Sequence, residues 1–216
     1  PRCMWFLSLE VAGLPMLSRR MAARRTAGRT CPFPDRSRRL RDVRHNVCGL
    51  DWCNMLGAME DMLQYREYMA QALELARKGA GWVDPNPLVG AVVVRDGEVL
   101  ATGYHDRYRG PHAERMAFDY ADAHGIDLTG ATVIDTLEPC CHVGSQPACT
   151  ALILAHGIAR VVVGSVDPNP IVAGKGLRIL EEAGVEVVRD VMREECDAIN
   201  RQFDHYITTG KPYIVD

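Results

Sequence analysis

The chain has 216 residues, of which 47% are hydrophobic and 25% are charged, so it can form one well-packed domain with a short appendage. The longest clean apolar run, LVGAVVV at 88–94, suits a buried strand and is far too short to span a bilayer. The formal net charge of −3 hides an asymmetry: residues 1–58 carry eleven arginines and four acidic residues, whereas residues 59–216 carry 14 basic and 24 acidic residues. Because an acidic body repels a phosphate backbone, we expect no nucleic-acid partner, and from the short apolar run we expect no membrane association.

Residues 1–58 differ in composition from the rest of the chain. They are rich in arginine, contain CPFP at 31–34, and show no sustained helical or strand period. We expect this segment to be a non-globular basic leader outside the native domain, with the natural start at Met59 or Met62. An organelle transit peptide and a basic nucleic-acid-binding arm are the alternatives.

From Asp61 onward, helical and strand periods alternate. The expected elements are a helix over 61–78, a strand over 88–94, its hairpin partner over 98–105 across the DG turn at 96–97, a helix over 113–124, a strand over 131–136, a helix over 149–156, a strand over 160–166, a helix over 174–183, a short strand over 185–188 and a closing helix over 190–208. This order predicts an α/β fold with a mostly parallel sheet, opened by one antiparallel hairpin and covered by helices on both faces. Ligands of such sheets bind at the carboxyl ends of the strands.

Two segments with metal-binding side chains fall where strands give way to helices. GPHAE contains His112 and Glu114, and TLEPCCHVGSQPAC contains Cys140 and Cys149. One imidazole and two thiolates form a ligand set that a catalytic zinc uses, with the fourth position left for water. H-x-E followed by P-C and a second cysteine is the arrangement of zinc deaminases, in which the glutamate moves protons and does not bind the metal. We therefore predict Zn²⁺ held by His112, Cys140 and Cys149, with Glu114 as the catalytic residue.

Other side chains in the cysteine cluster have different predicted roles. Cys141 adjoins Cys140, and two neighbours rarely bind one tetrahedral ion, so we interpret Cys141 as a small hydrophobic residue. His142 suits the wall of a pocket. A redox pair of Cys140 and Cys149 would leave the HAE motif unexplained. The spacing of the cysteines differs from a secreted disulfide framework, so we expect a reducing compartment and a cytoplasmic protein.

The motifs DPNPLVGAVVV, GPHAE, TLEPCCH, the long gap to Cys149 and DPNPIVAGKG together resemble the deaminase domain of the bifunctional riboflavin-biosynthesis deaminase/reductase, over roughly residues 62–216. The resemblance implies a three-layer α/β/α, cytidine-deaminase-like fold with a mixed five-stranded sheet. It implies hydrolytic deamination of 2,5-diamino-6-hydroxy-4-(5-phosphoribosylamino)pyrimidine. It also implies that the substrate pocket is lined by Asn86, His105, Asp167 and Asn169. For those of them at turns, local capping of the backbone is the alternative interpretation.

Two features depart from the family pattern. Ser145, in GSQPAC, stands where the family usually has a basic residue near the substrate phosphate, so the need for that phosphate stays open. TTGKPYIVD resembles the entry to a reductase domain. We expect a deaminase domain over 59–208 and a stub over 209–216 leading to a reductase domain that this chain lacks.

The expected partners are a small pyrimidine nucleotide as substrate, a second copy of the chain in a homo-oligomer, and a separate reductase as a further possibility. Two other functions are left open. One is deamination of another nucleobase or nucleoside, which the acidic body and the long gap between the cysteines disfavour. The other is a catalytically silent zinc-binding module that partners a reductase, which the presence of Glu114 disfavours.

Overall fold

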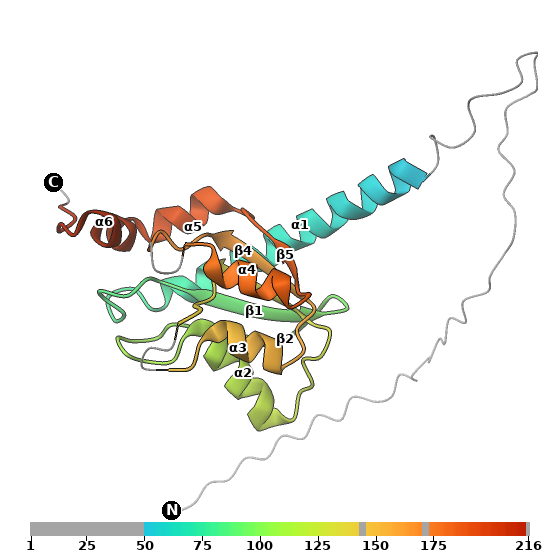
Figure 1. Ribbon diagram of the computed structural model, residues 1–216, viewed down its shortest axis with the longest axis horizontal. Coiled ribbons are helices and arrows are strands. Elements are labelled where there is room, and N and C mark those ends of the chain that lie inside the picture. Colours follow the sequence, from blue (N-terminus) through green and yellow to red (C-terminus); the bar gives the residue numbers. More distant parts are fainter. Residues whose placement is uncertain (1–49, 143–145, 170–172, 215–216) are drawn as a thin grey trace, which may run out of the picture. The chain divides into compact units, whose positions relative to one another are not determined.

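The computed structural model describes residues 50–142, 146–169 and 173–214 (Figure 1). The helices are α1 Leu50–Arg77, α2 Ala113–His124, α3 Cys149–Ala155, α4 Lys175–Glu182, α5 Arg193–Ile199 and α6 Arg201–Thr209. The strands are β1 Gly90–Arg95, β2 Glu98–Tyr104, β3 Thr132–Leu137, β4 Arg160–Ser165 and β5 Glu186–Val188. Among the helices of these residues, none combines the length and the apolar character needed to cross a membrane.

The five strands form one mixed sheet in the order β2-β1-β3-β4-β5. The hairpin of β1 and β2 is confirmed, and Asp96 and Gly97 both have the positive φ that a tight hairpin turn requires. β3, β4 and β5 are parallel, but β1 runs antiparallel to β3 as well as to β2. The expectation of a mostly parallel sheet was therefore wrong for the pair β1–β3, because the reversed strand of the hairpin, β1, lies inside the sheet between β2 and β3.

Helices cover both faces of the sheet, as expected for a three-layer α/β/α fold (Figure 1). Successive residues of a strand point to opposite faces, so Val133 and Ile134 of β3 belong to two separate cores. Val133 packs in the core that α2, α3 and α4 close, which includes Phe118. Ile134 packs in the core that α1 and α5 close, which includes Met69.

Helix α1 begins eleven residues before its expected start at Asp61. Its early turns extend away from the sheet (Figure 1), and Met59, Met62 and Leu63 are exposed. Burial against the sheet begins at Tyr65. The earlier turns hold good helix formers such as Leu, Met and Glu and no proline, which favours a helix. Residue 55 and residues 58–64 are exposed, so the sequence there has no apolar stripe from which this part of the helix could be predicted. The expected boundary at 58 lies inside α1, and residues 1–49 lie outside the described residues.

The closing helix expected over 190–208 is two helices, α5 and α6, which meet at Asn200. Asn200 has φ −113° and ψ 13°, outside the helical region, and its buried side chain bonds to the backbone of Leu88. The helical period of the sequence continues through this point, so the break comes from a contact that is distant in the chain.

Candidate metal centre

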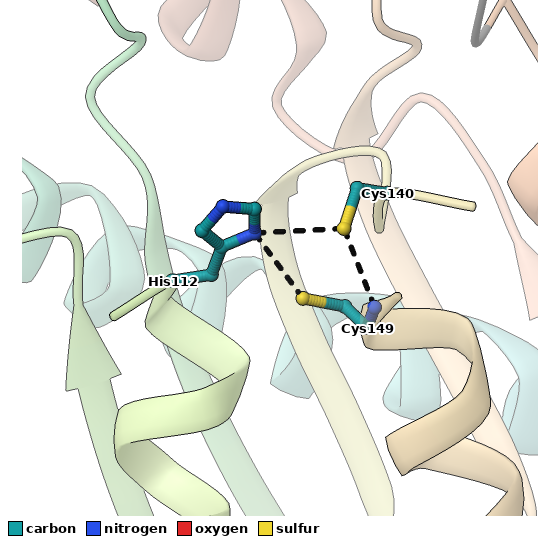
Figure 2. Close-up of side chains that lie close together, drawn as sticks. All are labelled: His112, Cys140 and Cys149. Carbon is teal, nitrogen blue, oxygen red and sulfur yellow. Dashed lines mark hydrogen bonds between the residues drawn. The ribbon is translucent and has the colours of Figure 1, made fainter. Parts of the chain in front are cut away.

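The three predicted zinc ligands lie together at the carboxyl ends of the central strands (Figure 2). His112 is the N-cap residue of α2, Cys140 follows β3, and Cys149 is the first residue of α3. His112 Nδ1 is 3.5 Å from Cys140 Sγ and 3.4 Å from Cys149 Sγ. All three ligand atoms lie within 4.8 Å of one another, a spacing that fits one ion at their centre.

Hydrogen bonds around Cys140 favour its thiolate form. The side chain of Cys149 and the ring of His112 lower the pKa of Cys140 to about 4, and the backbone N–H of Cys149 donates to Cys140 Sγ at 3.3 Å. That N–H belongs to the first residue of α3, where the helix dipole also favours negative charge. Zinc binds cysteine as the thiolate, so the donor set of one imidazole and two sulfurs fits Zn²⁺.

Glu114 stands beside this cluster in the first turn of α2. Only 3% of its surface is exposed. Burial raises the pKa of its carboxyl group, and the negative charge of Cys140 raises it further. A carboxyl group with a raised pKa holds a proton more readily than a free one, which suits a group that accepts a proton and returns it as a general acid.

A cavity of about 200 Å³ opens over the metal centre. Its walls include seven of the eight predicted site residues, namely Asn86, His105, His112, Glu114, Cys140, Asp167 and Asn169. The eighth, Cys149, is buried and does not line the cavity, but it contacts His112 and Cys140, which do. His142 also lines the cavity, whereas Ser145 lies outside the described residues.

Asn86 and His105 form a hydrogen-bonded pair in the cavity wall. His105 Nδ1 lies 2.9 Å from the carbonyl oxygen of Pro111, and a carbonyl only accepts, so Nδ1 carries the proton. His105 Nε2 then accepts from Asn86 Nδ2 at 3.3 Å. Burial lowers the pKa of His105, which keeps the ring neutral in this tautomer. The side-chain oxygen of Asn86 therefore points away from the ring, as an acceptor.

Asp167 and Asn169 follow β4. Asp167 Oδ1 accepts the backbone N–H of Asn169 at 2.8 Å, which is the local capping that turn residues of this kind make. Both residues also line the cavity, so this local capping is compatible with the predicted place in a substrate pocket, which stays a prediction. Burial raises the pKa of Asp167.

Sequence reasoning missed Glu138 and Phe203, which also line the cavity. A signal for Glu138 is present in the sequence: it is an acidic residue directly after an apolar strand, at the end of the sheet where ligands bind. Phe203 lies on α6, and nothing in its local pattern distinguishes it from an ordinary core aromatic residue.

Residues 62–165 match the family model of the cytidine and deoxycytidylate deaminase zinc-binding region. Over these residues the chain is similar to this family of zinc deaminases. The zinc expected from the sequence agrees with the family and with the donor set of the metal centre.

Individual proteins with high sequence identity to this chain come from riboflavin biosynthesis. The riboflavin biosynthesis protein RibD of Actinobacillus pleuropneumoniae is 52% identical over 149 residues, which are 69% of this chain and 39% of that protein. RibD of Aquifex aeolicus is 48% identical over 149 residues, 69% of this chain and 41% of that protein. The crystal structure of a diaminohydroxyphosphoribosylaminopyrimidine deaminase/5-amino-6-(5-phosphoribosylamino)uracil reductase from Thermotoga maritima matches with a TM-score of 0.69 and 48% identity, over 71% of this chain and 44% of that one. The chain thus spans about two fifths of the length of these curated relatives.

Proposed function

We propose that this chain catalyses the zinc-dependent hydrolytic deamination of 2,5-diamino-6-hydroxy-4-(5-phosphoribosylamino)pyrimidine to 5-amino-6-(5-phosphoribosylamino)uracil. The observation that carries the proposal is the buried Glu114 beside a His–Cys–Cys cluster at the floor of one cavity. The names of the relatives, which refer to riboflavin biosynthesis and to this deaminase, support the choice of substrate.

In this proposal His112, Cys140 and Cys149 hold one Zn²⁺. When bound, zinc lowers the pKa of a water molecule to about 7 and so supplies a nucleophile at neutral pH. Glu114 has no ligand role. Its carboxylate accepts a proton from the attacking water, and its acid form gives that proton to the ring nitrogen. The carboxylate then accepts the proton of the hydroxyl group newly attached to the ring carbon and gives it to the amino group, which leaves as ammonia. The burial that raises its pKa supports both steps.

The walls of the cavity are proposed to orient the pyrimidine. The oxygen of Asn86, directed by the bond of its amide nitrogen to His105, suits an N–H group of the substrate. Asp167 and Asn169 lie in the wall formed by the segment after β4 and suit polar groups farther from the reacting carbon. The neutral His105 orients the side chain of Asn86 and also contacts the substrate from the cavity wall.

The expected partners stay part of the proposal. The relatives' names join the deaminase to a reductase, and we propose that this chain works with such a reductase, which acts on the product. A homo-oligomer, the lack of a nucleic-acid partner and a cytoplasmic location are predictions. The domain limits of 59–208 and the stub at 209–216 are predictions as well.

The decisive experiment measures ammonia release by the purified chain from the phosphorylated diaminopyrimidine, its dephosphorylated form, cytidine and guanine. We expect turnover of the phosphorylated diaminopyrimidine. Activity on cytidine or guanine alone would assign the site to another base. Full zinc occupancy without turnover of any of them would favour the silent zinc-binding module. The comparison of the two diaminopyrimidines shows whether the substrate phosphate is required, which the serine at position 145 leaves open.

A further inference from the structure

The carboxylate of Glu138 accepts four backbone N–H groups, although it was not a predicted site residue. Oε2 accepts from Asp167 at 3.3 Å and from Gly174 at 2.8 Å. Oε1 accepts from Gly176 at 2.9 Å and from Leu177 at 3.4 Å. Hydrogen bonds to a charged acceptor are stronger than those between neutral groups, and Glu138 is only 4% exposed, so water competes little for them.

Three of these donors belong to the beginning of α4. The first N–H groups of a helix have no partner inside the helix, and the helix dipole places partial positive charge there. Gly174 is the N-cap residue and makes no side-chain cap, so Glu138 supplies the cap from another element. The carboxylate thereby fixes the start of α4 to the end of β3.

The fourth donor, Asp167, lies just after β4, at the start of the connection between β4 and α4. Oε2 of Glu138 therefore holds Asp167, where the chain leaves β4, and Gly174, where it enters α4. A backbone bond from Glu138 N–H to the carbonyl of Ser165 at 2.9 Å joins the same two strand ends. Asp167 in turn accepts the N–H of Asn169, so the position of both cavity residues depends on the place where Glu138 holds the backbone.

The close approach of α4 to the segment after β3 shows how tightly this junction is packed. A Cβ atom on Gly176 would lie 2.3 Å from the carbonyl oxygen of Pro139 and 3.1 Å from Oε1 of Glu138. The first distance is far shorter than van der Waals contact allows and the second is tight, so a side chain at this position would push α4 away from Pro139 and Glu138. Position 176 therefore offers a second way to disturb the same contact, without changing any acidic group.

We propose that Glu138 is a positioning residue for substrate binding: it holds Asp167 and Asn169 in the cavity wall and so sets the affinity for the substrate, while the metal centre and Glu114 carry out the chemistry. The inference rests on the proposed function, because it assigns substrate contacts to the segment after β4. It differs from a general structural role, which would alter stability, zinc content and turnover together.

Replacing Glu138 with Gln tests this role with minimal change in shape. One oxygen becomes an NH₂ group, which faces N–H donors and cannot accept from them, so two of the four bonds are lost. Contacts far from the reacting carbon stabilise the ground state and the transition state alike, so their loss raises KM and leaves kcat nearly unchanged. We expect KM to rise about tenfold or more, kcat to stay within about threefold, and zinc to remain at one ion per chain.

The assay uses the full chain, with ammonia release from the phosphorylated diaminopyrimidine and zinc measured by atomic emission. Glu182→Gln, the same change at the exposed far end of α4, is the matched control and should leave KM unchanged. Gly176→Ala should reproduce the rise in KM. An unchanged KM in Glu138→Gln, or a loss of kcat in proportion to lost zinc, would overturn the proposal. If neither variant folds, the role of Glu138 is structural and the proposal is refuted.

Failure of the proposed function gives a different result. In that case the unaltered chain releases no ammonia from the diaminopyrimidine. If the unaltered chain is active and the KM of Glu138→Gln is normal, the proposed function stands and only the positioning role is lost.

Discussion

The side chain of Asn200 makes both hydrogen bonds that a neighbouring strand would offer to Leu88. Its Oδ1 accepts from Leu88 N–H at 2.8 Å, and its Nδ2 donates to the Leu88 carbonyl at 2.9 Å. Asn200 is 4% exposed and stands between α5 and α6, whereas Leu88 lies just before β1. One buried amide thus satisfies the backbone beside the segment that carries Asn86.

Asn200→Ala should therefore lower the stability of the protein. It leaves the part-buried N–H and C=O of Leu88 without these partners, at a cost of about 2 kcal/mol, which corresponds to a fall in Tm of roughly 4–8 °C. Gln202→Ala removes an exposed amide from the next turn and should change Tm little. Thermal unfolding followed by circular dichroism compares the two, and equal Tm values would mean that the Asn200 bonds contribute nothing net.

The predicted metal centre makes Cys149 a zinc ligand and Cys141 not, so the two substitutions should affect zinc content differently. Cys149→Ser should lose most of the bound zinc, because a serine hydroxyl does not ionise at neutral pH as a ligand thiol does. Cys141→Ser should keep about one zinc per chain, since Cys141 is not part of the cluster of ligand atoms. Zinc content after dialysis is the measurement. The reverse pattern would show that the second ligand has been misassigned.

Glu114→Gln should separate chemistry from binding. The amide keeps the shape of the side chain but cannot move protons, so kcat should fall by about 10²–10⁴-fold. KM should change by only a few fold and zinc should stay bound, because Glu114 is not a ligand in this assignment. A loss of zinc in this variant would instead place the Glu114 carboxylate on the metal.

Most of the fold and site could be predicted because each depends on local pattern. The interval 113–124 was expected as a helix and is α2, since its apolar period, its acidic first turn and its terminal glycine all agree. The His–x–Glu and Pro–Cys motifs carry their chemistry in a few adjacent letters. The break at Asn200 and the hydrogen bonds of Glu138 could not be predicted, because their partners lie 112 and 29–39 residues away in the sequence. The early start of α1 was missed because the side chains at 58–64 are exposed and form no apolar stripe.

Asp135 gives a pH-dependent prediction. It lies on β3 between Ala91 and Val163 and is fully buried, and neither of its carboxyl oxygens has a hydrogen-bond partner among the residues that the structure describes. Burial, helped by the charge of Glu114, raises its pKa well above 3.8. Above pH 4 the unfolded chain releases this proton while the folded chain retains it, so the stability present at lower pH is lost as the pH rises toward the folded pKa.

Asp135→Val should therefore stabilise the protein at pH 8 by about 1–3 kcal/mol, and by less at pH 5. Urea unfolding of the zinc-loaded proteins at both pH values measures the difference. Asp119→Val, at an exposed position on α2, is the control and should show no such pH dependence. A variant that is less stable than the original at both pH values would indicate that Asp135 has a hydrogen-bond partner in solution.

The early turns of α1 give a prediction about where the folded domain begins. Met59, Met62 and Leu63 are exposed, and inward packing begins with Tyr65, Tyr68 and Met69. A chain that starts at Met59 therefore keeps the buried face of α1 and should retain its zinc and its Tm within about 2 °C, since surface changes alter stability by about 0.5 kcal/mol or less.

The contrasting truncation starts at Ala70. It removes the side chains of Tyr65 and Met69 from the core beneath the sheet, and each fully buried side chain of this size contributes about 1.5–3 kcal/mol. We expect this shorter chain to unfold at a temperature lower by 10 °C or more, roughly, or to aggregate. A similar fall in Tm for the chain that starts at Met59 would mean that residues before Met59 pack against the domain and that its boundary lies earlier in the sequence.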